Sequence, residues 1–458
     1  MRTRISIAAL LLMVLLALAS PALAASVAVQ PGNATADGFL PSTGCGCHGP
    51  LVAAWSPSMH AQAIVDPVFL TKVAEAQAEA GEETAIFCKR CHSPIGNMTG
   101  DSDGVASEVA GEGVTCMFCH QVTGLDGEPA NTGFLLQPDL TRRAQLTDPA
   151  APHPATYSEL HTTAEFCGGC HNVDHPTNGT HLESTYAEWA SSPYADEGIV
   201  CQDCHMSSAP GVIGPSTGTA CSTGKERDNI FSMSFVGANV GQGPSDASTA
   251  LLKTAASIEL QSPEVVSAGS VATMTVTITN KGAGHYLPTG LTEVREMWLS
   301  VYAKGVDGAI TQIGERLFHT VMKGADGSFP VEMWDAVGIQ SDDRIPPRES
   351  AREEYFFEMP ADAESITVFA VLNYRSVPDE LAEKAGVENP TTEMVSTSQA
   401  VFATQGAKDA ASAEGTTDAT DTQGLSIWVV VLGAVLVLAV AALTGAKILA
   451  SHKRLKQG

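Results

Sequence analysis

The sequence has few basic side chains. Among its 458 residues, 25 are Lys or Arg and 51 are Asp or Glu, so the formal net charge is -26. A protein that binds the phosphate backbone of a nucleic acid needs a basic surface, and this composition excludes that class. Charged residues make up only 17% of the chain and hydrophobic residues 44%, which also excludes a wholly disordered chain. The length is sufficient for two or three domains.

Long periodic apolar segments are scarce between residues 45 and 235, where Gly, Pro, Ser and Thr are frequent. Only short helices are expected there, such as one over residues 67–80. A domain of this size with so little regular pattern needs a core that side chains alone do not supply. All 11 cysteines and 10 of the 13 histidines lie between residues 45 and 221. This concentration indicates a cofactor domain.

Four segments carry the pattern Cys-x-x-Cys-His, which is the attachment signature of haem c. In this chemistry two thiols add to the two vinyl groups of one porphyrin, and the adjacent His lies beneath the iron as its proximal ligand. Zinc sites gain nothing from a His directly after the second Cys, and cysteines this close in sequence rarely form structural disulfides. The predicted haem-binding residues are Cys88, Cys91, Cys116, Cys119, Cys167, Cys170, Cys201 and Cys204, with His92, His120, His171 and His205 as iron ligands.

A fifth segment departs from the pattern by one residue, because Gly44 stands where the first cysteine is expected. In one interpretation Cys45 and Cys47 both attach one haem through a contracted loop, with His48 as proximal ligand. In a second, Cys47 makes a single thioether and Cys45 forms a disulfide with Cys221. This accounts for all eleven cysteines, and we favour it. The third interpretation is a haem-free Cys45–Cys47 pair. The expected cofactor is haem c with its iron, in four copies from the full motifs and a fifth from this segment.

Five further histidines lie in the same region, one for each of the five proximal ligands. Their number matches bis-histidine coordination, in which each iron has a second, distal His. A histidine in the second half of the chain, His285, has two interpretations: a distal ligand supplied across a domain boundary, or a turn residue. The five predicted distal ligands are His60, His153, His161, His175 and His181.

Downstream of residue 250 the pattern changes to that of β-strands. Residues 271–279 alternate between polar and apolar side chains with a period of two. Short strands separated by Gly, Pro and Asp predict an antiparallel, immunoglobulin-like β-sandwich over residues 251–403. Residues 25–250 are assigned to the cofactor domain. Further strands are expected over residues 297–303, 354–359 and 366–374.

Two apolar segments at the ends of the chain indicate export and membrane anchoring. Residues 1–24 combine two arginines, an apolar run and a small-x-small cleavage site, as in a secretory signal peptide. Residues 425–446 are apolar, uncharged and long enough for a transmembrane helix. The positive-inside rule leaves the basic tail 447–458 in the cytoplasm. We expect a single-pass cell-membrane protein, with its large domains at the cell exterior or in the periplasm and residues 404–424 as a flexible tether.

Two stretches, one after the first cysteine pair and one before the last, resemble those of a known family. They read Trp55-x-x-Ser58-x-His60-Ala61 and Glu188-Trp189-x-x-Ser192-x-Tyr194. Over about residues 45–236 the chain resembles the multihaem cytochromes c related to the tetrahaem electron carriers of nitrifying bacteria and to the extracellular cytochromes of metal-reducing bacteria. The segment 285–290 resembles the β domain that often follows such haem domains. The resemblance implies closely packed haems, electron transfer as the main function and His60 as a distal ligand.

The predicted fold class is therefore multidomain. It combines a mostly irregular, short-helix multihaem cytochrome c domain, an antiparallel immunoglobulin-like β-sandwich and one C-terminal transmembrane helix. Irons with two protein ligands have no open position for a substrate, so no catalytic residues are expected. We expect electron transfer between a membrane-linked donor and an external or periplasmic acceptor, with other cytochromes or quinol-linked membrane complexes as partners.

Two alternatives remain open. One is a reductase or oxidase of a small nitrogen or sulfur compound, which needs one haem with an open axial position. The irregular segment around Cys47 is the first candidate for such a haem. The other alternative is a subunit of an extracellular cytochrome filament, formed by self-assembly.

Overall fold

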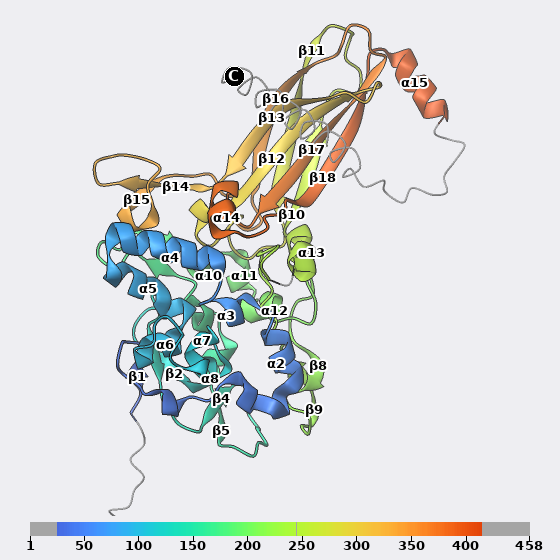
Figure 1. Cartoon of the computed structure of the whole chain (residues 1–458). Helices are drawn as coiled ribbons and strands as arrows, with labels where there is room; N and C mark the ends of the chain where they lie inside the picture. Colours follow the sequence, from blue (N-terminus) through green and yellow to red (C-terminus); the bar gives the residue numbers. More distant parts are fainter. Residues whose placement is uncertain (1–24, 244, 415–458) are drawn as a thin grey trace, which may run out of the picture.

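The computed structural model describes residues 25–243 and 245–414. Figure 1 shows two parts: one built of short helices and small sheets, and one of long strands. Helix α13 (Ser245–Ala255) connects them, and strand β10 (Ala256–Gln261) follows it directly. The chain therefore passes from the first part to the second through one short helix.

The helices of the first part are short, and the predicted helix over residues 67–80 is confirmed as α4. The carboxylate of Asp66 accepts a hydrogen bond from the Val68 amide (3.1 Å), and Pro67 occupies the first helical position, where its missing N–H costs nothing. Gly81 ends α4 with a φ of 92°, which favours glycine. The helices are α2 (Gly49–Trp55), α3 (Met59–Gln62), α4 (Pro67–Ala80), α5 (Glu82–His92), α6 (Pro94–Thr99), α7 (Glu108–Gly111), α8 (Cys116–Gln121), α9 (Glu165–Gly168), α10 (Thr185–Ala190), α11 (Pro193–Asp196) and α12 (Cys201–His205), with the 3₁₀-helices η1 (Ala36–Gly38), η2 (Ser42–His48) and η3 (Glu159–Thr162).

Four small sheets accompany these helices. One has the order β1-β3-β2, and the others are the pairs β4-β5, β6-β7 and β8-β9. The strands are β1 (Val27–Ala28), β2 (Val122–Leu125), β3 (Phe134–Leu136), β4 (Arg142–Ala144), β5 (Ala155–Tyr157), β6 (Val173–Asp174), β7 (His181–Glu183), β8 (Ser216–Thr219) and β9 (Glu226–Ile230). The prediction of a mostly irregular, short-helix domain is wrong in omitting them. None of these strands is long enough to produce a visible period of two in the sequence.

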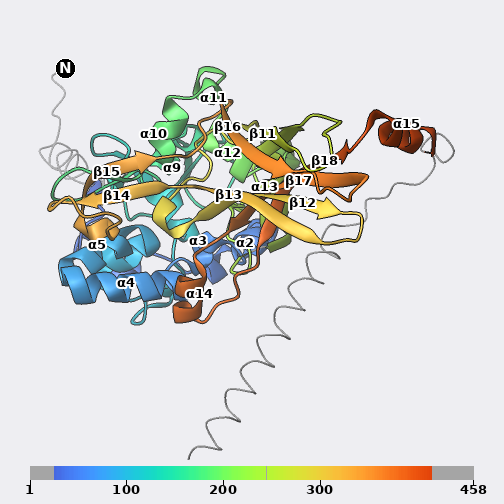
Figure 2. The same ribbon diagram turned by 90° about the horizontal axis from the view of Figure 1, so that it is seen from above.

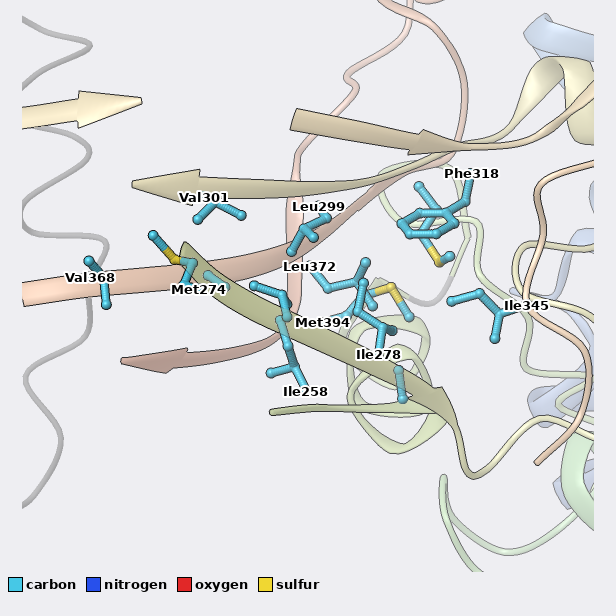
Figure 3. Packing of buried hydrophobic residues seen from close by; sticks show 14 of the residues in the cluster. Ile258, Met274, Ile278, Leu299, Val301, Phe318, Ile345, Val368, Leu372 and Met394 are labelled. Carbon is cyan, nitrogen blue, oxygen red and sulfur yellow. The ribbon is translucent and has the colours of Figure 1, made fainter. Parts of the chain in front are cut away.

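The second part consists of two antiparallel sheets, with the orders β10-β11-β16 and β13-β12-β17-β18. Their further strands are β11 (Val271–Asn280), β12 (Glu296–Gly305), β13 (Ile310–Phe318), β16 (Ser350–Glu358), β17 (Ser365–Arg375) and β18 (Thr392–Phe402). Side chains from both sheets form one core, in which Met274 and Ile278 of β11 lie near Leu299 and Leu372 of the facing sheet (Figure 3). All four are fully buried, as inward positions of alternating strands should be. These strands support the predicted β-sandwich.

The second part packs onto the first through a hairpin and a helix. Figure 2 shows helix α14 beside α4, where Val68 packs with Leu381 and Ala382. In the segment between β14 and β15, Glu332 Oε2 lies 2.7 Å from Lys72 Nζ of α4. The elements of this contact region are β14 (Thr320–Gly324), β15 (Ala336–Asp342), α14 (Asp379–Ala385) and the 3₁₀-helices η4 (Thr292–Val294) and η5 (Met333–Asp335).

The predicted fold class also needs correction at its C-terminal end. Within residues 25–243 and 245–414, no helix is long and apolar enough to cross a membrane. The predicted span 425–446 lies outside the described residues, as do the predicted signal peptide 1–24 and tail 447–458. The predicted tether is helical in its first half, where α15 (Gln405–Glu414) forms and Lys408 pairs with Glu264. Alanine-rich composition favours this helix.

Candidate haem-binding site

A connected cavity of about 1600 Å³ runs through the first part of the molecule and reaches the second. All eleven cysteines line it, together with ten histidines. Protein interiors are close-packed and contain few voids larger than a water molecule. Thiols, imidazoles and apolar side chains line this space. It therefore fits flat aromatic groups that are attached through sulfur and carry a metal bound by imidazole nitrogen.

The attachment motifs lie on or at the ends of short helices. Three of the full motifs lie within α5, α8 and α12, and the remaining one begins in α9 and continues past the end of that helix. Residues i, i+3 and i+4 share one face of a helix, so two cysteines and the following histidine point to the same side. The contracted segment lies in η2, where Cys45 interrupts the helical backbone. We number the sites in chain order by their proximal histidines: site 1 (His48), site 2 (His92), site 3 (His120), site 4 (His171) and site 5 (His205).

Each proximal histidine has a hydrogen-bond partner at Nδ1. A histidine that donates its Nδ1–H to a carbonyl or carboxylate presents Nε2 to a metal. The five proximal side chains therefore have the arrangement that metal-ligating histidines need. The partners are Ala220 O for His48 (2.6 Å), Ala63 O for His92 (2.9 Å), Arg143 O for His120 (2.7 Å), Glu183 Oε1 for His171 (3.1 Å) and Val236 O for His205 (2.6 Å).

Four of the five proximal histidines face a second imidazole. A metal–imidazole bond is about 2.0–2.1 Å long and the ring centre lies about 1.1 Å beyond the nitrogen, so two imidazoles on one metal have centres roughly 6.3 Å apart. The observed spacings therefore fit bis-histidine ligation of four irons. The ring centroids are 6.3 Å apart for His48 and His153, 6.3 Å for His171 and His60, 6.1 Å for His120 and His161, and 6.2 Å for His205 and His285.

Burial lowers the pKa of four of these imidazoles, those of His60, His120, His161 and His205. It lowers the pKa of His60 to about 3 and the pKa of His205 to about 4. A neutral imidazole has the free lone pair that a metal ligand requires. His171 differs: although burial lowers its pKa, the hydrogen bond and charge of Glu183 raise it to about 9.

His92, at site 2, faces no second imidazole at such a spacing within the described residues. Its ring stacks on Phe69 of α4, with 3.6 Å between the centroids and 8° between the planes. The phenyl ring covers a face of the imidazole, and among the described residues site 2 has one recognised histidine ligand.

The structure places the predicted distal histidines in two groups. His60, His153 and His161 each lie opposite a proximal histidine, and His175 and His181 do not. Instead, His285, which follows β11 in the second part, lies opposite His205 (6.2 Å). Of the two interpretations of His285, the geometry favours the ligand.

The two remaining histidines have other partners. His175 lines the cavity, and its Nε2 lies 3.0 Å from the carbonyl oxygen of Trp334. His181 is exposed and lies outside the cavity lining, with its Nδ1 2.5 Å from Asp174 Oδ1. The five further histidines counted in the sequence therefore do not provide one distal ligand for each of the five sites.

Thiols from different motifs lie against one another. The thiols of three pairs are direct neighbours and act on each other's pKa: Cys45 and Cys116, Cys91 and Cys170, and Cys167 and Cys201. Site 1 is therefore adjacent to site 3, and sites 2 and 5 are adjacent to site 4. Groups attached at these thiols are held close together.

The disulfide between Cys45 and Cys221 does not form. All eleven cysteines are free, and Cys221 Sγ lies 3.8 Å from the hydroxyl of Thr223. Since Cys45 meets Cys116 instead, the interpretation that we favoured for the first segment is not the one that the structure adopts.

A comparison of folds relates the chain to a multihaem cytochrome. The structure is similar to a penta-haem cytochrome c552 from Thermochromatium tepidum, with a TM-score of 0.60 and 19% identity over 80% of this chain and 99% of that one. The CARDB domain of the PF1109 protein from Pyrococcus furiosus covers 32% of this chain, with 14% identity over 85% of its own length and a TM-score of only 0.18. No protein-family model and no curated protein matches the sequence.

At 19% identity the likeness concerns the fold alone. The chain has the fold of a multihaem cytochrome c, and its cysteine and histidine geometry fits the same cofactor. The two observations together support haem c with its iron.

Proposed function

We propose that this protein is an electron-transfer cytochrome c with five haems, four of which have two histidine ligands. The observation that carries the proposal is the set of four imidazole pairs 6.1–6.3 Å apart, a spacing that fits one iron between each pair of rings. Haem c supplies one-electron redox chemistry when it is bound. The chain's own residues supply the thiols and axial nitrogens, orient each imidazole through Nδ1, and surround the cavity with apolar side chains.

The contacts between motifs support a continuous path for electrons. The first and third motifs meet through Cys45 and Cys116, and the fourth and fifth through Cys167 and Cys201. Cys119 of site 3 acts electrostatically on Cys167 of site 4, so these two motifs are also neighbours. The path runs from site 1 through sites 3 and 4 to site 5, with site 2 as a branch at site 4.

The partners that we propose are other redox proteins, such as cytochromes or quinol-linked complexes. A formal net charge of -26 supports a partner with a cationic docking face. The predicted signal peptide supports a location on the extracytoplasmic side, as does the type of haem attachment.

A reductive titration of the purified protein tests the proposal. We expect reversible uptake of five electrons per chain. For the bis-histidine haems we expect midpoint potentials below that of the standard hydrogen electrode, because histidine ligation and acidic surroundings favour oxidised iron.

Two matched variants add a spectroscopic test. His161→Ala removes one member of an imidazole pair and should convert one low-spin haem to high spin. His181→Ala removes an exposed histidine outside the cavity and should leave the spectrum unchanged. A protein that takes up no electrons, or two variants that behave alike, would contradict the proposal.

A further inference from the structure

We propose that the iron of site 2 has an open axial position that binds a small uncharged ligand, such as carbon monoxide or nitric oxide. The inference rests on the proposed function, because it requires a haem at site 2, and it adds a ligand-binding site to an electron path. Its main support is the difference between His92 and the other four proximal histidines, each of which faces a second imidazole 6.1–6.3 Å away. Within the described residues His92 faces no second imidazole at that spacing, and the phenyl ring of Phe69 covers one face of its imidazole.

Lys72 lines the cavity one helical turn beyond Phe69, but it cannot take the open position. Its Nζ lies 2.7 Å from Glu332 Oε2, 3.0 Å from Glu75 Oε2 and 4.7 Å from the ring centre of Trp334. Burial alone would lower the pKa of Lys72, but the hydrogen bonds with Glu332 and Glu75 raise it. An ammonium held between two carboxylates has no lone pair to offer a metal.

His175 is the other nitrogen ligand to consider, because it also lines the cavity. Its Nε2 lies 3.0 Å from Trp334 O and its Nδ1 lies 3.1 Å from the Thr177 hydroxyl. A carbonyl near Nε2 does not by itself exclude ligation, since His161 Nε2 lies 2.8 Å from a carbonyl as well. The difference is that the His161 ring faces a proximal imidazole at the spacing of an iron, whereas His175 does not.

The charges around site 2 select the class of ligand. The carboxylates of Asp66 and Glu183 both act on the His92 imidazole, and Glu75 and Glu332 neutralise Lys72. An anion that approaches Asp66 or Glu183 meets like charge in surroundings of low dielectric constant, which is unfavourable. A small uncharged ligand has no such penalty. Cys91 of site 2 meets Cys170 of site 4, so the open position has a direct neighbour in the electron path.

Carbon monoxide difference spectra of the reduced holoprotein count open irons. We expect one carbon monoxide per chain in the wild type, or one-fifth of the haems, and one high-spin haem in the oxidised form. His153→Ala opens a second iron and should raise the count to two. His175→Ala should leave it at one. The double variant Cys88→Ala/Cys91→Ala lacks the haem of site 2 and should bind none, while it retains four haems.

A wild-type protein that binds no carbon monoxide would overturn the inference. Binding that appears only in His175→Ala would overturn it too, by identifying His175 as the sixth ligand. Binding that persists in the double cysteine variant would place the open iron at another site. Haem content and reversible reduction are measured on the same samples. Five reversibly reduced haems without carbon monoxide binding would contradict this inference and leave the proposed function standing.

Discussion

Glu183 lies against a proposed haem ligand. It is largely buried, and its Oε1 lies 3.1 Å from Nδ1 of His171, the proximal ligand of site 4. A carboxylate that accepts the Nδ1 proton makes the imidazole a stronger donor at Nε2. Because a stronger donor stabilises oxidised iron, Glu183 is expected to lower the midpoint potential of site 4, the site that joins the other haems.

Replacing this carboxylate should raise one midpoint potential. We expect Glu183→Gln to raise the potential of a single haem by about 50–100 mV, since a tenfold change in a one-electron equilibrium is about 59 mV. The matched control is Asp174→Asn, which removes a carboxylate bonded to His181, a histidine that faces no proximal ligand. Spectroelectrochemical titration compares the two. Equal shifts in both variants would show that the effect is one of overall charge.

Glu293 gives the stability of the protein a pH dependence. Both of its carboxylate oxygens are buried without a hydrogen-bond partner, and burial raises its pKa to about 7. The folded protein therefore favours the protonated acid. This contribution to stability is complete below the ordinary pKa of a glutamic acid and is lost as the pH rises through about 7.

As the pH rises, the Glu293→Gln variant should become more stable than the wild type. We expect similar stability at pH 5 and a more stable variant at pH 8, by up to about 3 kcal/mol. Denaturant unfolding at the two pH values measures this difference, with Glu358→Gln, an exposed acid, as the control. A difference that is the same at both pH values would rule out titration of Glu293 as its cause.

At the scale of secondary-structure elements, an ion pair connects α10 to the segment that follows β15, and the same glutamate binds the segment that carries His285. Arg344 Nη1 lies 2.5 Å from Glu188 Oε1, and the two side chains are 7% and 5% exposed. Glu188 Oε2 also accepts hydrogen bonds from the Tyr286 amide (3.1 Å) and the Thr289 hydroxyl (2.7 Å). Glu188 therefore positions the backbone next to the proposed distal ligand of site 5.

Removing the Arg344 side chain should lower the stability of the folded protein and weaken the ligation of iron by His285. Arg344→Met leaves Glu188 buried and unpaired, which typically costs about 3–5 kcal/mol. We also expect partial loss of His285 ligation, seen as additional carbon monoxide binding to the reduced protein. Arg352→Met, at an exposed pair with Glu354, should change neither property. Unchanged stability in Arg344→Met would contradict the role given to the ion pair.

How far the sequence predicts these elements depends on their length. Residues 67–80 contain a cap, a proline and a periodic apolar face, so α4 could be predicted from local signals. Strands such as β6 (Val173–Asp174) have two residues and no period to detect. The proximal ligands could be predicted because thiols and imidazole are adjacent in the chain. The pairing of His171 with His60 depends on tertiary packing between segments far apart in the chain. Local sequence signals therefore do not predict it.

At the scale of the whole molecule, the second part is more than a neighbour of the haem-binding part. It places His285 opposite His205 of site 5 and Glu332 beside Lys72, near site 2. Counting histidines within one predicted domain assigned five distal ligands to five irons. That count did not include His285 of the other part, and it included His175 and His181, which face no proximal imidazole at the spacing of a pair. Site composition therefore depends on packing between the two parts.

The intact mass of the purified chain under denaturing conditions tests the central claim most directly. Thioether bonds survive denaturation, so attached haems remain on the polypeptide. We predict the mass of the polypeptide plus five haems, with five haems per chain in a parallel pyridine haemochrome assay. An increase of only four haems would contradict attachment at site 1, and no increase would contradict the assignment as a cytochrome c.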